Sequence, residues 1–155
     1  MTSSVRENIN GIGQVQASAS TVRRIVRHLP TVGRIVLGLV FFVFGLDGLL
    51  HFMPQPTGPF PEGAMAFGMA LMKTGYLFQL LKATEILGGA LLLSNRFVPL
   101  ALTILAPVIV NIVAFHAFLE PEGLPLALAV LAIEIGLAWR YRAAFRPMLI
   151  GRPRS

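Results

Sequence analysis

Four long apolar stretches constrain the fold of this chain more than any other feature. They occupy residues 33–53, 76–94, 97–119 and 124–141. A helix needs about 20 consecutive apolar residues to cross the ~30 Å hydrocarbon core of a bilayer. Only 13% of the residues are charged and 55% are hydrophobic, whereas soluble domains are about 25% charged. The sequence therefore predicts four transmembrane helices. An all-helical soluble protein with long buried helices is the less favoured alternative.

The first stretch, residues 33–53, follows basic residues, as the apolar core of a signal peptide does. It is longer than such a core, and no small-residue cleavage motif follows it. We therefore predict that it is retained as a transmembrane helix.

Charged residues are unevenly distributed between the connections. Arginine is concentrated before and at the start of the first stretch, at the 95–96 turn and after residue 139, while the other two connections carry Glu62, Lys73, Glu120 and Glu122. The positive-inside rule then predicts that both termini and the 95–96 turn are cytoplasmic. The loops at 54–75 and 120–123 are predicted to face outward. Four spans with both ends inside form an all-α, antiparallel four-helix bundle.

This topology divides the chain into three regions. Residues 1–32 are predicted to be a flexible, basic cytoplasmic segment, part of which suits an anionic membrane surface. Residues 33–141 form the four-helix transmembrane domain, and residues 142–155 form a basic cytoplasmic tail. Between the first two spans, prolines break the helix at 54–61, and the Met-rich stretch 64–75 is too short to cross a membrane. We predict a short interfacial helix there.

Six polar residues within the predicted spans are candidates for binding a ligand or handling protons: Asp47, Lys82, Glu85, Asn111, His116 and Glu134. Counting inward from the outer boundary at ~1.5 Å per residue places most of them at depths of roughly 7–15 Å. A lone charge at the bilayer centre costs about 2.5–3.5 kcal/mol. We therefore expect them to face one another in a buried polar cluster. No catalytic residue is assigned.

The charge balance of this cluster restricts its chemistry. The carboxyl groups of Asp47, Glu85 and Glu134 oppose one cation, Lys82. Two uncompensated negative charges would not persist in a low-dielectric interior. Either at least one carboxyl group stays protonated, as proton-coupled chemistry requires, or a cationic ligand joins the cluster. The alternative is that polar residues only hold the helices together, at about 0.6 kcal/mol per interhelical hydrogen bond. For Asn111 alone, and for histidines near the interface, that structural role is favoured.

Several other classes of site are disfavoured or excluded. The chain has no cysteine, so it cannot supply thiolates for disulfides, thiol catalysis or iron–sulfur ligation. Its net charge of +6 comes from arginines spread over the membrane flanks, so nucleic acid is not a predicted partner. Met65, Met69 and Met72 recur at helical spacing without a nearby histidine, which is typical of an adaptable apolar face. No metal site is predicted.

Three segments together carry a family resemblance. They are RIVLGLVFFVFGLDGLLHF (34–52), KTGYLFQLLKATEILGGALLLSNRFVPLAL (73–102) and APVIVNIVAFHAFLEP (106–121). Their shared features are a glycine-bearing first helix, a glutamate shortly before Gly-Gly in the second, and an Asn-to-His segment in the third. This pattern resembles the DoxX family of small bacterial four-helix membrane proteins, over residues 34 to about 145.

The resemblance implies a multi-pass protein of the bacterial cytoplasmic (inner) membrane. The family is named for a subunit associated with thiosulfate:quinone oxidoreduction, although most members have no assigned activity. Glu85, Asn111 and His116 lie in the matching segments. The implied function is that of an accessory subunit of a membrane redox system, which binds a quinone-like or other small amphiphile at the polar cluster.

The expected partners are the lipid bilayer and a membrane redox enzyme, and an oligomer is compatible with the sequence. Electrons would come from the partner or from the bound quinone. The main alternative is a non-enzymatic membrane scaffold or assembly partner whose polar cluster is structural. A small transporter is disfavoured because four short spans show no internal repeat. Whether the chain is an enzyme is left open.

Overall fold

The computed structural model describes residues 28–54, 58 and 60–149 of the 155-residue chain. The chain divides into two units, residues 1–32 and 33–155. In the first unit only residues 28–32 are described, and they are helical. The predicted flexible N-terminal segment therefore lies mostly outside the described residues, as does the end of the predicted C-terminal tail.

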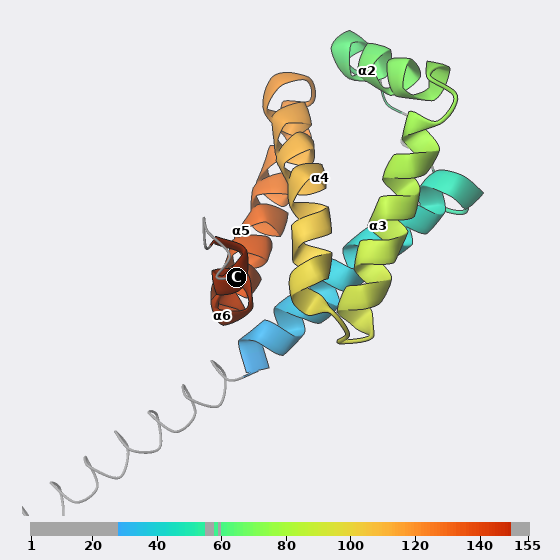
Figure 1. The fold of residues 1–155 in the computed structure, drawn as a ribbon. Coiled ribbons are helices and arrows are strands. Elements are labelled where there is room, and N and C mark those ends of the chain that lie inside the picture. The colour runs from blue at the N-terminus through green and yellow to red at the C-terminus, as the bar shows by residue number, and fades with distance from the viewer. Residues whose placement is uncertain (1–27, 55–57, 59, 150–155) are drawn as a thin grey trace, which may run out of the picture. The chain divides into compact units, whose positions relative to one another are not determined.

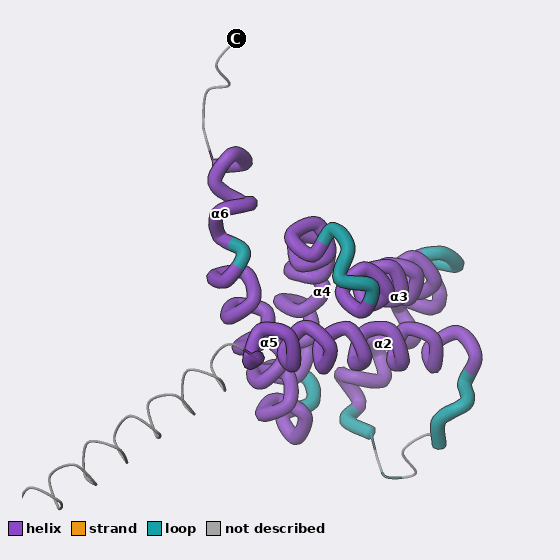
Figure 2. Tube along the Cα trace, turned by 90° about the horizontal axis from the view of Figure 1, so that it is seen from below, coloured by secondary structure: helices purple, strands orange, loops and turns teal. Residues whose placement is uncertain are grey.

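The described chain is built of helices joined by short connections, and no strand occurs among the described residues (Figures 1 and 2). The first helix, α1, is described from His28 to Leu50. It is followed by α2 (Glu62–Lys73), α3 (Leu77–Leu93), α4 (Val98–Phe118), a 3-10 turn (Pro121–Gly123), α5 (Leu124–Arg140), α6 (Arg142–Phe145) and a second 3-10 turn (Arg146–Leu149). The prediction of an all-α fold is confirmed.

Three helical segments are long and apolar enough to cross a membrane: His28–Leu50, Val98–Phe118 and Pro121–Arg140. The remaining predicted span, residues 76–94, is shorter than expected: its helix, α3, has only 17 residues. It becomes a fourth candidate span when it is taken together with α2, from which it is bent by 94°. The structure thus indicates a multi-pass membrane protein with three to four candidate spans.

The corner between α2 and α3 follows from the local sequence. Gly75 has a φ of +80°, a left-handed conformation that glycine adopts at little cost. The hydroxyl of Thr74 accepts a hydrogen bond from the backbone N–H of Leu77 at 3.0 Å, so it satisfies one unpaired donor at the start of α3. On α2 itself Ala64 is buried, whereas the predicted methionine face is exposed.

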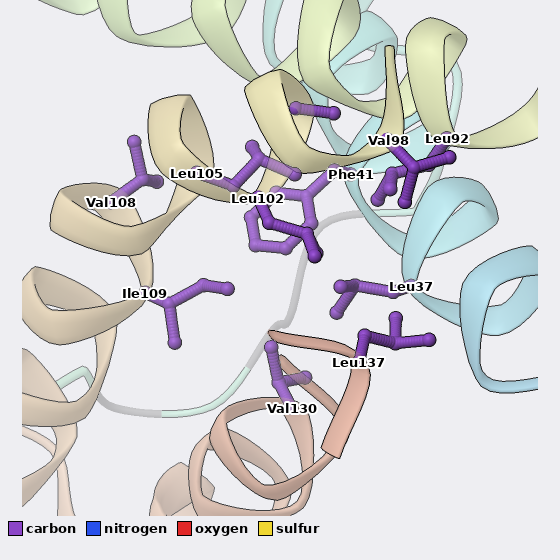
Figure 3. Packing of buried hydrophobic residues seen from close by; sticks show 11 residues of the cluster. Leu37, Phe41, Leu92, Val98, Leu102, Leu105, Val108, Ile109, Val130 and Leu137 are labelled. Atoms are coloured by element: carbon purple, nitrogen blue, oxygen red, sulfur yellow. The ribbon is translucent and has the colours of Figure 1, made fainter. Parts of the chain in front are cut away.

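An apolar core lies between α1, α3, α4 and α5. Figure 3 shows side chains from these helices gathered around α4, which contributes most of the cluster. The largest fully buried side chains are Leu37, Leu92, Leu102, Leu105 and Ile109. Helix α4 packs against both α3 and α5. A polar side chain that points from one of these helices toward the core is therefore enclosed by the other helices.

Helices α1 and α3 approach each other closely enough for their backbones to touch. A Cβ atom added to Gly89 of α3 would lie 2.5 Å from the backbone nitrogen of Phe42 and 2.8 Å from the carbonyl oxygen of Gly38. Only a residue without a side chain fits there. This is the role that small residues play at helix crossings in membranes.

Arg34 forms a second contact between α1 and α3. Its guanidinium Nη1 donates hydrogen bonds to the backbone carbonyl oxygens of Leu92 and Leu93, at the C-terminal end of α3. Both carbonyls lie in the last turn of α3, and the C-terminal end of a helix attracts positive charge. Arg34 is buried. In the sequence this arginine indicates only the membrane topology, and its packing role was not predicted.

Candidate functional site

A cavity of about 320 Å³ lies between α1, α3, α4 and α5. Most of its wall is apolar, and the polar groups on it belong to Lys82, Glu85 and His116. The apolar lining residues are Val40, Phe41, Phe44, Ile112, Leu126, Ala127 and Val130. Three of the six sequence-predicted candidates therefore meet at one cavity, and they come from two different helices.

Lys82 and Glu85 form an ion pair one turn apart on α3. The ammonium Nζ of Lys82 lies 2.8 Å from Oε2 of Glu85. The Lys82 side chain is 17% exposed and that of Glu85 is 6% exposed. Each group therefore has a partner of opposite charge in its apolar surroundings. Lys82 also lies over the ring of Phe78, with Nζ 5.7 Å from the ring centroid.

The position of Lys82 depends on a glycine of the neighbouring helix. A Cβ atom at Gly48 of α1 would lie 2.5 Å from both Cδ and Cε of Lys82. The aliphatic stem of the lysine thus occupies the space that any other residue at position 48 would fill. At Gly45, one turn earlier, a Cβ atom would similarly meet Glu85 and Ile86.

His116 of α4 lies on the cavity wall and contacts Glu120 at the end of its own helix. Its ring nitrogen Nδ1 lies 2.5 Å from Oε2 of Glu120 and 3.0 Å from the carbonyl oxygen of the same residue. A proton on Nδ1 would satisfy these acceptors and leave Nε2 available. From the sequence, Glu120 was predicted only to lie in an outer acidic turn. Its spacing of four residues from His116 was the signal that could have identified this contact.

Asp47 is buried but does not line the cavity. Its Oδ1 atom accepts a hydrogen bond from the backbone N–H of Met53 at 2.7 Å. Between them the chain leaves α1 through His51, which has a φ of +51°. The carboxylate therefore holds the turn at the end of α1. Its hydrogen bond gives it a structural role.

Glu134 of α5 is 5% exposed and is also absent from the cavity wall. Its Oε2 atom is enclosed and has no hydrogen-bond partner among the described residues. It lies on the buried face of α5, one turn beyond Val130, which does line the cavity. The predicted cluster is thus divided into a cavity group and two separate buried carboxyl groups, those of Asp47 and Glu134.

Asn111 does not join the predicted cluster, because its side chain is exposed on the outside of α4. The buried face of this helix carries Leu105, Val108 and Ile109, and continues through Ile112 to His116 at the cavity. Asn111 is about 100° around the helix from Ile112. The prediction used depth along the span alone, and depth does not determine which side of a helix a residue occupies.

Among the described residues, no group of three or more His, Asp or Glu side chains is placed to hold a metal ion. No protein-family model, no curated protein and no solved structure matches this chain.

Proposed function

We propose that this protein binds a small amphiphile, such as a quinone, in the cavity between α1, α3, α4 and α5. The observation that carries this proposal is the cavity itself: about 320 Å³, largely apolar, with the Lys82–Glu85 pair and His116 on its wall. Ligand sites in proteins combine apolar walls with a few placed polar groups, and their volumes start near 300 Å³. The cavity therefore suits a ring-sized head group.

The two ends of an amphiphile find matching surroundings. Phe44 and Leu126 line the cavity and are 50% and 67% exposed. The cavity thus reaches the protein surface beside these two side chains, where an apolar tail would continue into lipid. Inside, the ammonium group of Lys82 can donate a hydrogen bond to a carbonyl oxygen, and the free Nε2 of His116 can accept one from a hydroxyl group. The apolar rings of Phe41 and Phe44 provide flat surfaces for a ring head group.

The membrane arrangement that we propose has four spans, with both termini in the cytoplasm. The arginine distribution supports this orientation. The 94° bend between α2 and α3 supports an interfacial α2, because a helix perpendicular to a span lies along the membrane surface. The methionines exposed on α2 would then contact lipid. We place the protein in the bacterial cytoplasmic membrane, as the resemblance to the DoxX family implies.

Within this arrangement the protein would act as an accessory subunit of a membrane redox system. A bound quinone would supply the redox chemistry, and the residues of this chain would position its head group and exclude water. The alternative is a membrane scaffold with a structural polar cluster. One observation favours it: Lys82, Glu85 and Asp47 already have partners within the protein.

The proposal is tested by native mass spectrometry and lipid extraction of the detergent-purified protein. We expect wild type to retain a defined amphiphile and His116→Leu to retain about tenfold less, because losing one hydrogen bond costs about 1.4 kcal/mol. The matched control is Asn111→Leu, which changes an exposed residue of the same helix and should retain as much as wild type. If wild type carries no defined amphiphile, or both variants lose it equally, the cavity is not the site and the scaffold function takes precedence.

A further inference from the structure

The unpartnered carboxyl group of Glu134 is not used by the proposed binding site. Along α5 the buried residues are Ala127, Val130, Glu134 and Leu137, which recur at helical spacing on one face. Ala127 and Val130 line the cavity, whereas Leu137 belongs to the apolar core. Glu134 therefore lies between the cavity and the core, about 6 Å along the helix from Val130.

No charged group in the described part of the chain compensates this carboxyl group, since it forms no ion pair or hydrogen bond there. The other titratable groups on the surrounding helices have their own partners or lie at the helix ends. These groups are His28, Arg34 and Asp47 on α1, Lys82 and Glu85 on α3, His116 on α4 and Arg140 on α5.

We propose that Glu134 is a proton-binding site, and that its proton exchanges with the surroundings of the protein through the cavity. An isolated carboxylate in apolar surroundings is far more costly than the neutral acid, so the group holds a proton instead of a charge. One helical turn separates Glu134 from Val130, which lines the cavity. This inference deepens the proposed function, because it gives the amphiphile site an adjacent proton donor and acceptor. It does not require that a ligand be bound.

The protonation state can be measured directly by infrared spectroscopy of the folded protein at neutral pH. We expect the C=O stretching band of a protonated carboxyl group, and we expect Glu134→Gln to remove it. The matched control is Glu62→Gln, which changes an exposed glutamate of α2 and should leave the band in place. Because glutamine keeps the shape of the side chain without its charge, the variant is expected to fold. Absence of the band in wild type would show that Glu134 is ionised and would overturn the proposal.

The route of exchange can be tested with a hydrophobic carbodiimide. The acid O–H adds across a C=N bond of the reagent: the carboxyl oxygen bonds to the central carbon and the proton moves to nitrogen. The acyl group then shifts to nitrogen, which leaves a stable N-acylurea that contains the whole reagent. Peptide mapping by mass spectrometry should locate this adduct at Glu134 in wild type and find none in Glu134→Gln.

Replacing either of two alanines on α5 with phenylalanine tests whether the reagent reaches Glu134 through the cavity or through the lipid. Ala127→Phe places a ring in the cavity and should abolish most of the labelling, whereas Ala132→Phe faces outward and should label like wild type. Val130→Leu fills less of the same cavity and can be used if Ala127→Phe folds poorly. Equal labelling in all three variants, or none in wild type, would overturn the cavity route. Neither measurement contains the amphiphile, so a failure here is distinguishable from a failure to bind it.

Discussion

Replacing Lys82 with Met is expected to lower the free energy of unfolding by about 3 kcal/mol. The substitution leaves the carboxylate of Glu85 buried without its partner, and removing one member of a buried ion pair costs about 3–5 kcal/mol. The lower end of this range applies because the Lys82 side chain is 17% exposed. The effect is measured by denaturant-induced unfolding of the purified protein in mixed micelles.

The double variant Lys82→Met, Glu85→Met is the control for this experiment. It removes both charges, and replacing a whole buried pair by apolar residues is often neutral or stabilising. We therefore expect it to recover most of the stability that the single variant loses, which a double-mutant cycle quantifies. If the single variant is as stable as wild type, or the double variant is no better than the single one, the ion pair does not hold this site together.

Replacing Gly89 with Ala is expected to destabilise the protein by about 2 kcal/mol, through the close approach of α1 and α3. The new methyl group would collide with the backbone of Phe42 and with the carbonyl oxygen of Gly38. Backbone atoms cannot move aside as the end of a side chain can, so the helices must separate. Overpacking of this kind costs about 1–3 kcal/mol. Thermal unfolding of the variant beside wild type measures the loss.

Gly136→Ala provides the matched control for Gly89→Ala. It makes the same chemical change inside a helix, α5, but a Cβ atom at Gly136 would meet nothing within 4 Å. Alanine is favoured over glycine in a helix by about 1 kcal/mol, so this variant should be as stable as wild type or slightly more stable. Equal losses from both substitutions would mean that the close crossing of α1 and α3 does not explain the result.

The helical segments could be predicted because apolar runs and proline-rich breaks mark them in the sequence. The predicted stretch 97–119 contains α4 (Val98–Phe118), and 124–141 contains α5 (Leu124–Arg140). Stretch 76–94 contains α3, but its helix is only 17 residues long. The sequence pattern did not show how sharply α2 and α3 are bent, because that angle depends on the conformation of Gly75 and the hydrogen bond at Thr74.

The candidate site could be predicted only in part. Depth along each span selected Lys82 and Glu85 as deep residues and His116 as a shallower one, and the structure places all three on the cavity. Depth could not show that Asn111 is exposed, because that depends on the rotation of α4 about its axis. Rotation is decided by packing of the core, which involves residues far apart in the sequence. For the same reason the packing role of Arg34 could not be foreseen.

The most direct test of the central claim is photolabelling of the full-length protein in lipid with a quinone analogue that carries a photoreactive azide on its ring. Amphiphile binding in the cavity predicts adducts at lining residues of three helices: Val40, Phe41 and Phe44 on α1, Ile112 and His116 on α4, and Leu126, Ala127 and Val130 on α5. An excess of unmodified quinone should compete these adducts away, and His116→Leu should weaken them. Adducts that are confined to outward-facing residues such as Val110, and that the unmodified quinone does not displace, would contradict a binding site in this cavity.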